Sequence, residues 1–267
     1  MISPLFESLL DSSMFLLPLE VDNDNPLEGG EMENYLRNDS EIAPQFKLQL
    51  DDKEVNLEEL EDLLEYPRLN TVGELWLGRN EFSDRGVELL SNSKKLSNLE
   101  VISLAGNKLS DQALVSLANS KTLAKLKRLF VQNNFISAEG IGCLAKSEVI
   151  TSLEILYLKQ NPLGDKGAKA LATSCSLQNL KELYLGETEL GNEGLAQLCG
   201  GVLWPNLVTL SLAQNSLDDK SAQILAATRS FPKLITLDLC GNRISDEALD
   251  FIRCSPHFKS LKALQVN

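Results

Sequence analysis

The chain has 267 residues, of which 43% are hydrophobic and 24% charged, and its formal net charge is -13. This composition is typical of a folded protein of one or two domains and excludes a fully disordered or collagen-like chain. No apolar run approaches the ~18–20 residues of a membrane-spanning helix, and the N-terminus lacks the basic region of a signal peptide. We therefore expect a cytoplasmic protein that is not bound to a membrane.

Residues 1–44 form an acidic N-terminal segment in which ten carboxylates face Arg37 alone. Two apolar clusters, at 5–10 and 14–17, precede a turn-rich acidic stretch. We predict a short helical cap followed by a flexible linker, with a docking or secretion segment as the alternative. Residues 71–267 hold 20 acidic and 21 basic residues, and no basic patch appears along the chain. We therefore expect no nucleic acid partner, because phosphates demand a basic footprint.

Residues 45–267 repeat one pattern every 27 residues, and we assign them to a second domain. The string at 75–80, LWLGRN, returns at 102–107 and 129–134, and the register runs from Leu48 to Leu264 without insertion. An apolar residue lies three positions before each strand pair, and another lies two positions after the Asn. This L-x-x-L-x-L-x-x-N-x-L pattern predicts nine strand positions of a leucine-rich repeat.

The second half of each repeat predicts a helix. Pairs such as Ser83-Asp84, Ser110-Asp111 and Ser245-Asp246 offer side-chain acceptors for the helix N-cap. Apolar residues with helical spacing follow, for example Leu114 and Leu117. The fold class is therefore an α/β solenoid shaped as a horseshoe, with about eight full repeats, parallel strands on the concave face and helices on the convex face.

The Asn of each repeat is expected to satisfy backbone groups of the turn that no strand ladder reaches. Thr188 replaces this Asn in one copy. A threonine can satisfy fewer groups than an asparagine, so we expect the fifth full repeat to be locally weaker.

The motif N-x-[LIF]-[SGD]-[DNA]-x-[GAS], as at 161–167, resembles the ribonuclease-inhibitor-like subclass of leucine-rich repeats. This subclass also occurs in Nod-like receptors and in the Ran GTPase-activating protein. The resemblance covers residues 45–267 and departs from the inhibitor in having a single repeat length.

Alternate residues of each strand point outward, so the concave face is predicted as columns. Four residues of the central column are aromatic: Trp76, Phe130, Tyr157 and Tyr184. Exposed aromatic clusters mark protein interfaces, and the alternative is that the rings pack on one another across strands. The neighbouring columns supply a charged rim: Arg79, Arg128, Lys159, Glu182 and Glu187. We predict these nine residues as the partner-binding surface, with the small Ser211 and Ala213 at its C-terminal limit.

Catalytic chemistry has few candidates in this chain. His257 is the single histidine, and the five cysteines form no C-x-x-C pair. No Gly-rich phosphate loop or spaced metal ligands are present. We therefore predict no enzyme activity, no cofactor and no metal. The exposed edge of the last strand either pairs in a dimer or is kept soluble by its shortness and by Lys262, and we predict the second, which gives a monomer.

The sequence thus predicts a non-enzymatic interaction scaffold that binds another protein on its concave face. A secreted bacterial effector, acting inside a host cell, is compatible with this prediction. The alternative is a regulator of a small GTPase, as the resemblance to the Ran GTPase-activating protein implies, with Arg79 or Arg243 reaching the nucleotide.

Overall fold

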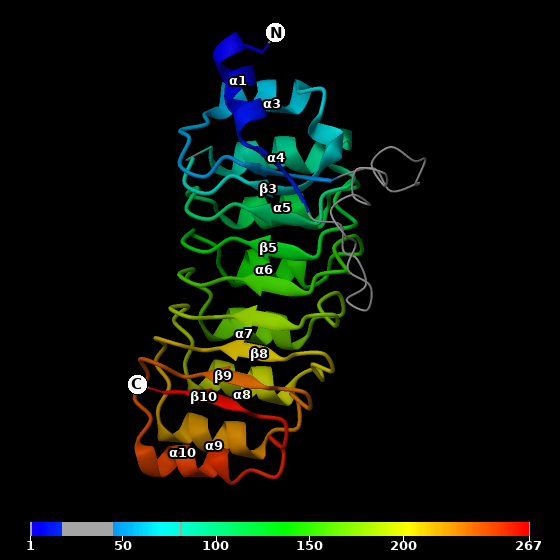
Figure 1. The fold of residues 1–267 in the computed structure, drawn as a ribbon. Helices are drawn as coiled ribbons and strands as arrows, with labels where there is room; N and C mark the ends of the chain where they lie inside the picture. Colours follow the sequence, from blue (N-terminus) through cyan, green and yellow to red (C-terminus); the bar gives the residue numbers. More distant parts are fainter. Residues whose placement is uncertain (1, 18–44, 81, 267) are drawn as a thin grey trace, which may run out of the picture.

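The computed structural model describes residues 2–17, 45–80 and 82–266. They form a stack of strand–turn–helix units, with the strands on one face and the helices on the opposite face (Figure 1). The strands are β1 (Met14–Leu16), β2 (Phe46–Gln49), β3 (Val72–Trp76), β4 (Val101–Ser103), β5 (Arg128–Phe130), β6 (Ile155–Tyr157), β7 (Glu182–Tyr184), β8 (Thr209–Ser211), β9 (Thr236–Asp238) and β10 (Ala263–Gln265).

Helix α1 precedes β1, and from β2 onward the described α-helices alternate with the strands. They are α1 (Pro4–Ser12), α3 (Leu57–Glu65), α4 (Ser83–Asn92), α5 (Asp111–Ala118), α6 (Ala138–Leu144), α7 (Gly164–Ala172), α8 (Asn192–Gly200), α9 (Asp219–Ala227) and α10 (Asp246–Arg253). Two 3-10 turns, η1 (Leu69–Thr71) and η2 (Lys94–Leu96), lie in the first links from helix to strand.

The ten strands form one sheet in chain order, and β2 to β10 are parallel. From β3 to β10 each residue pairs with the residue 27 positions on, as Trp76 with Ser103 and Tyr157 with Tyr184. A constant register places equivalent residues of all repeats in straight columns. The predicted α/β solenoid and its nine parallel strand positions are confirmed. We call the side of the sheet that faces away from the helices the strand face.

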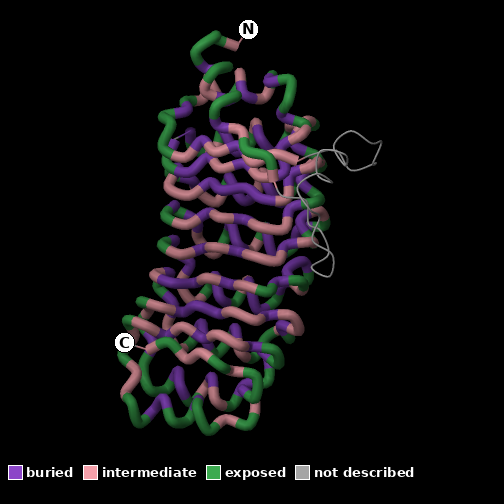
Figure 2. Tube along the Cα trace, in the orientation of Figure 1, coloured by how far each residue is buried: buried purple, intermediate pink, exposed green. Residues whose placement is uncertain are grey.

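The core lies between the sheet and the helices and runs through the whole stack (Figure 2). The leucines of the strand pattern and of the helix faces are almost completely buried, for example Leu129, Leu156 and Leu117. Parallel strands need this cover on the helix side, and no single unit can bury its apolar face alone. Burial of these side chains is therefore the main force that holds neighbouring repeats together.

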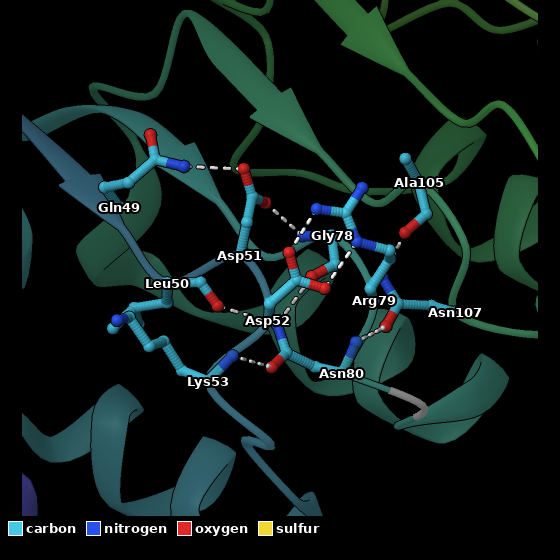
Figure 3. Close-up of polar contacts among 10 residues, drawn as sticks. All are labelled: Gln49, Leu50, Asp51, Asp52, Lys53, Gly78, Arg79, Asn80, Ala105 and Asn107. Atoms are coloured by element: carbon cyan, nitrogen blue, oxygen red, sulfur yellow. Dashed lines mark hydrogen bonds and ion pairs between the residues drawn. The ribbon is translucent and has the colours of Figure 1, made fainter.

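A column of asparagine side chains joins the turns after the strands. Asn134 accepts hydrogen bonds from the backbone N–H groups of Asn107 and Leu109, both at 3.0 Å. Its amide nitrogen donates to the carbonyls of Leu104 at 3.1 Å and Val131 at 2.9 Å. Figure 3 shows the first copy, in which Asn80 lies between Lys53 and Asn107. The predicted role of the asparagine column is therefore present in the structure.

Thr188 changes the turn of the preceding repeat. Its hydroxyl donates to the carbonyl of Leu185 at 2.8 Å, but it offers no amide oxygen to the residues at 161–163. There the N–H of Leu163 donates to the carbonyl of Asn161, and the N–H of Gly164 donates to that of Thr188, both at 2.9 Å. Gly164 adopts a φ of 56°, which favours glycine. The predicted local weakness at this repeat stays a prediction.

Ser110 and Asp111, at the start of α5, serve two repeats at once. The side chain of Ser110 caps its own helix by accepting from the N–H of Gln112 at 3.3 Å. The carboxylate of Asp111 reaches forward and accepts from the N–H and the hydroxyl of Ser137, both at 2.7 Å. The N-cap prediction is wrong for Ser83, which is the first residue of α4, has a φ of 56° and caps nothing.

Residues 2–17 cover the N-terminal end of the stack with helix α1 and strand β1. Phe6 and Leu10 of α1 join the buried core, and β1 pairs antiparallel with β2. The hydroxyl of Tyr66, after α3, donates to the carboxylate of Asp11. The predicted linker falls within 18–44, outside the described residues, and the division at residue 45 stays a prediction.

Tyr66→Phe is expected to lower the free energy of unfolding by about 1–2 kcal/mol at neutral pH, because a hydrogen bond to a charged acceptor is lost. Burial and the Asp11 carboxylate raise the pKa of Tyr66 from 10.0 to about 12. The folded state thus favours the protonated phenol, whose contribution is complete below pH 10.0 and is lost as the pH rises through about 12. Urea unfolding should show a difference between the two proteins at neutral pH that closes in alkali. An equal difference at both pH values would contradict this role.

Candidate functional site: an aromatic strip on the strand face

Four aromatic side chains form a continuous stack on the strand face, which we call the aromatic strip: Trp76, Phe130, Tyr157 and Tyr184. The ring centroids of Trp76 and Phe130 lie 5.4 Å apart, those of Phe130 and Tyr157 5.8 Å, and those of Tyr157 and Tyr184 4.1 Å. The interplanar angles of 19° to 29° are those of stacked rings. All four side chains keep an intermediate exposure.

Ser103 explains why Trp76 meets Phe130 although their strands are not neighbours. Strand β4 separates β3 from β5, and it places Ser103 in the same column as the rings. Ser103 is small and only 4% exposed, so the two large rings close over it. The strip is therefore unbroken from β3 to β7.

The geometry shows that these aromatics are both stacked and partly exposed, and their role in binding a partner stays a prediction. The rings pack on one another across strands, and they remain partly open to solvent. Each face of Phe130 and of Tyr157 is covered by a neighbouring ring. A molecule approaching these two residues therefore meets ring edges, which carry the positive end of the quadrupole.

The column before the strip holds charges that are fixed by neighbours within the chain. Glu74 pairs with Arg128 at 3.0 Å and accepts from the indole nitrogen of Trp76 at 3.2 Å. Glu182 accepts from the hydroxyl of Tyr184 at 2.7 Å. Burial and this carboxylate raise the pKa of Tyr184 above its usual range. The ring therefore stays neutral and hydrogen-bonded at physiological pH.

The columns after the strip hold two more ion pairs. Lys159 pairs with Glu187 at 3.0 Å, and Gln160 donates to the same carboxylate at 3.0 Å. The hydrogen bond from Gln160, followed by Lys159, lowers the pKa of Glu187. Arg79 lies farther from the strip, in the turn after β3, where its guanidinium pairs with the carboxylate of Asp52 (Figure 3).

Eight of the nine predicted site residues thus lie in the aromatic strip or beside it. The ninth, Arg79, lies at its edge and is paired with Asp52. Sequence reasoning missed Lys47 as a member. Its ammonium lies 4.4 Å from the centroid of the Trp76 ring, the geometry of a cation–π contact. The 27-residue register gave a signal, because Lys47 occupies the column position of Glu74 one strand earlier.

Among the described residues, the geometry gives no candidate site for metal binding or for a reactive thiol. Within 2–17, 45–80 and 82–266, no group of three or more His, Cys, Asp or Glu side chains is arranged to hold a metal ion. Burial and Asp238 raise the pKa of the Cys240 thiol, which keeps it in the less reactive protonated form. None of the helices in the described part is long and apolar enough to cross a membrane.

The comparison with family models agrees with the repeat architecture. A family model described as Leucine Rich repeat matches residues 95–118, 149–172 and 176–199, and each match covers one strand and the helix after it. No curated protein matches the chain. Among solved structures, an internalin from Listeria monocytogenes is 19% identical with a TM-score of 0.43. That alignment covers 79% of this chain and 65% of the internalin, so the chain spans less than two thirds of the internalin's length.

Proposed function

We propose that the chain, whose repeats match the leucine-rich repeat model in three segments, is a non-enzymatic scaffold that binds another protein on its strand face through the aromatic strip. The observation that carries this proposal is the stack itself, in which four aromatic side chains are partly exposed and fixed by their neighbours. Aromatic residues supply much of the energy of protein interfaces.

Preorganisation supports the same proposal. Ring contacts and ion pairs already hold the strip and its rim, for example Glu74 with Arg128 and Lys159 with Glu187. A partner that docks on such a surface loses little further side-chain freedom to ordering it. The apolar centre and charged rim have the anatomy of a protein–protein interface.

The test compares capture of proteins from a cell lysate by the wild type and by the triple variant Trp76→Ala/Tyr157→Ala/Tyr184→Ala. We expect the variant to lose the partner, because each truncation of an interface aromatic typically weakens binding by about tenfold or more. Circular dichroism first establishes that both proteins are folded.

The matched control is the double variant Phe135→Ala/Phe251→Ala, which removes aromatics that are 65% and 51% exposed and lie outside the strip. This control should capture the partner as the wild type does. Equal capture by all three proteins would refute the role of the strip and would turn attention to the acidic N-terminal segment.

We further propose the ribonuclease-inhibitor-like subclass, a monomer, no nucleic acid partner and a cytoplasmic location. The repeat motif supports the subclass, and the near-neutral charge of residues 71–267 speaks against a nucleic acid partner. The short last strand beside Lys262 supports a monomer, and the five free cysteines support a cytoplasmic location. A role as a secreted effector would use residues 1–44 as the export signal, and transfer of a fused reporter tests it. No contact of the described residues favours the alternative of a GTPase regulator that uses Arg79 or Arg243, and Arg79 is paired with Asp52.

A further inference from the structure

The two ends of the aromatic strip differ in what covers the outermost ring. Trp76, at the N-terminal end, is stacked on one side by Phe130 and carries the ammonium of Lys47 over its ring. Tyr184, at the C-terminal end, is stacked by Tyr157 alone among the described residues. Its other neighbour in the sheet register is Ser211, which is 7% exposed and whose side chain is too short to cover the whole ring. The strip is thus capped by a cation at one end only.

Acidic side chains flank the end of the strip that has no cap. Asp238 lies one strand beyond Ser211 in the same column, and Glu182 lies beside Tyr184. Neither carboxylate has an ion-pair partner among the residues that the structure describes. The outward positions 182, 184, 186, 209, 211, 213, 236, 238 and 240 include these two carboxylates and no basic residue. This part of the strand face therefore carries uncompensated negative charge.

The carboxylate of Asp238 is fixed but not saturated. Its oxygens accept from the hydroxyl of Ser211 at 2.7 Å and from the N–H of Cys240 at 3.0 Å. A carboxylate has about four acceptor positions, so capacity for further donors remains. The hydrogen bonds hold the carboxylate toward β8, the strand that follows Tyr184.

We propose that the partner protein places an arginine side chain against the outer face of Tyr184, with its guanidinium paired to the carboxylates of Asp238 and Glu182. Charge complementarity and the uncovered ring face both point to a cation. A guanidinium fits better than an ammonium, because it is planar, stacks on an aromatic ring and still donates sideways to carboxylates. Lys47 on Trp76 is the same type of contact made within the chain.

The inference rests on the proposed function, because it names one feature of the partner that the strip would bind. It can be tested without that partner. The probe is N-acetyl-arginine amide, and the control probe is N-acetyl-citrulline amide, which has nearly the same shape and no charge. Both are titrated into the full chain while backbone amide resonances are followed by NMR.

The arginine probe is expected to shift the resonances of residues 209–213 and 236–240 in a saturable way, and the citrulline probe to leave them unchanged. Asp238→Asn should weaken binding of the arginine probe by roughly tenfold, and Glu182→Gln should weaken it as well. Glu139→Gln, at an exposed position on α6, should not. Equal shifts with citrulline, or full binding by the Asp238→Asn variant, would overturn the inference, as would the absence of shifts with arginine.

The outcomes separate this inference from the proposed function. Loss of the partner by the triple aromatic variant, together with no response to the arginine probe, would retain the strip and refute the arginine contact. Capture of the partner by the triple variant would refute the strip, whatever the probe shows.

Discussion

Asn134→Ala is expected to lower the free energy of unfolding by about 3–5 kcal/mol, although the change removes only a small polar group. Asn134 is 5% exposed and accepts from two buried backbone N–H groups, those of Asn107 and Leu109. Truncation leaves both donors and the carbonyl of Leu104 without their partner, whereas the carbonyl of Val131 still accepts from the amide of Asn161 at 2.9 Å. An unsatisfied buried polar group costs ~1–3 kcal/mol, and partial relaxation of the turn keeps the total below the simple sum.

Urea unfolding followed by circular dichroism measures this effect. The matched control is Asn98→Ala, because the Asn98 side chain also joins two repeats, by donating to the carbonyl of Asn70 at 3.1 Å and accepting from Lys125 at 2.8 Å, but both hydrogen bonds are exposed to solvent. Water replaces an exposed hydrogen bond, so this control should change the free energy of unfolding by no more than ~0.5 kcal/mol. Similar values for the two variants would show that the buried asparagine column is not a major source of stability.

Thr188 shows why one interruption of that column is tolerated. The preceding turn has Gly164, whose φ of 56° allows the backbone to satisfy its own donors. In the turn that Asn134 serves, the position equivalent to Gly164 is Ser110, which caps α5. The loss of stability on removing an asparagine of the column therefore depends on the preceding repeat. It is smaller where a glycine such as Gly164 follows the turn of that repeat.

The columns of this fold could be predicted because they depend on two short periods in the sequence, the alternation of residues along a strand and the 27-residue repeat. Alternation along each strand and a constant repeat length fix which residues share a column, as for Trp76 and Phe130. Strand β1 escaped prediction, because its three residues have no copy in the repeat and pair with β2 across a long segment. The second role of Asp111 escaped for a similar reason, since its partner Ser137 lies in the next repeat.

The sequence predicted which residues of the candidate site share a column, but it did not predict which side chains contact one another. Register alone placed Tyr157 beside Tyr184. The contact of Trp76 with Phe130 over Ser103, and the ammonium of Lys47 on Trp76, depend on side-chain torsions that no pattern specifies. For the same reason the sequence did not distinguish the paired Glu74 from Glu182, which has no cation beside it.

Gly201 and Gly200 are adjacent, yet alanine at these two positions is expected to act in opposite directions. A Cβ atom on Gly201 would lie 2.3 Å from the carbonyl oxygen of Ala172 and 2.9 Å from its carbonyl carbon. These are backbone atoms of the preceding repeat and cannot rotate away. Gly201→Ala should therefore destabilise the protein by about 2–3 kcal/mol. A Cβ on Gly200, the last residue of α8, meets nothing within 4 Å, and Gly200→Ala should stabilise by ~0.5 kcal/mol.

The reason for this contrast lies in a local change of the repeat. Ser147 and Ser174 occupy the equivalent position of other repeats, and their hydroxyls donate to the carbonyls of Ala118 and Ala145. At Gly201 the backbone comes closer, and the N–H of Val202 donates directly to the carbonyl of Ala172 at 2.8 Å. Restoring the serine of the repeat pattern should therefore also destabilise the protein, contrary to what a consensus of the repeats suggests. Thermal unfolding of Gly201→Ala, Gly201→Ser and Gly200→Ala measures all three effects. A stabilising Gly201→Ser would mean that the two repeats can separate at this point with little loss of packing.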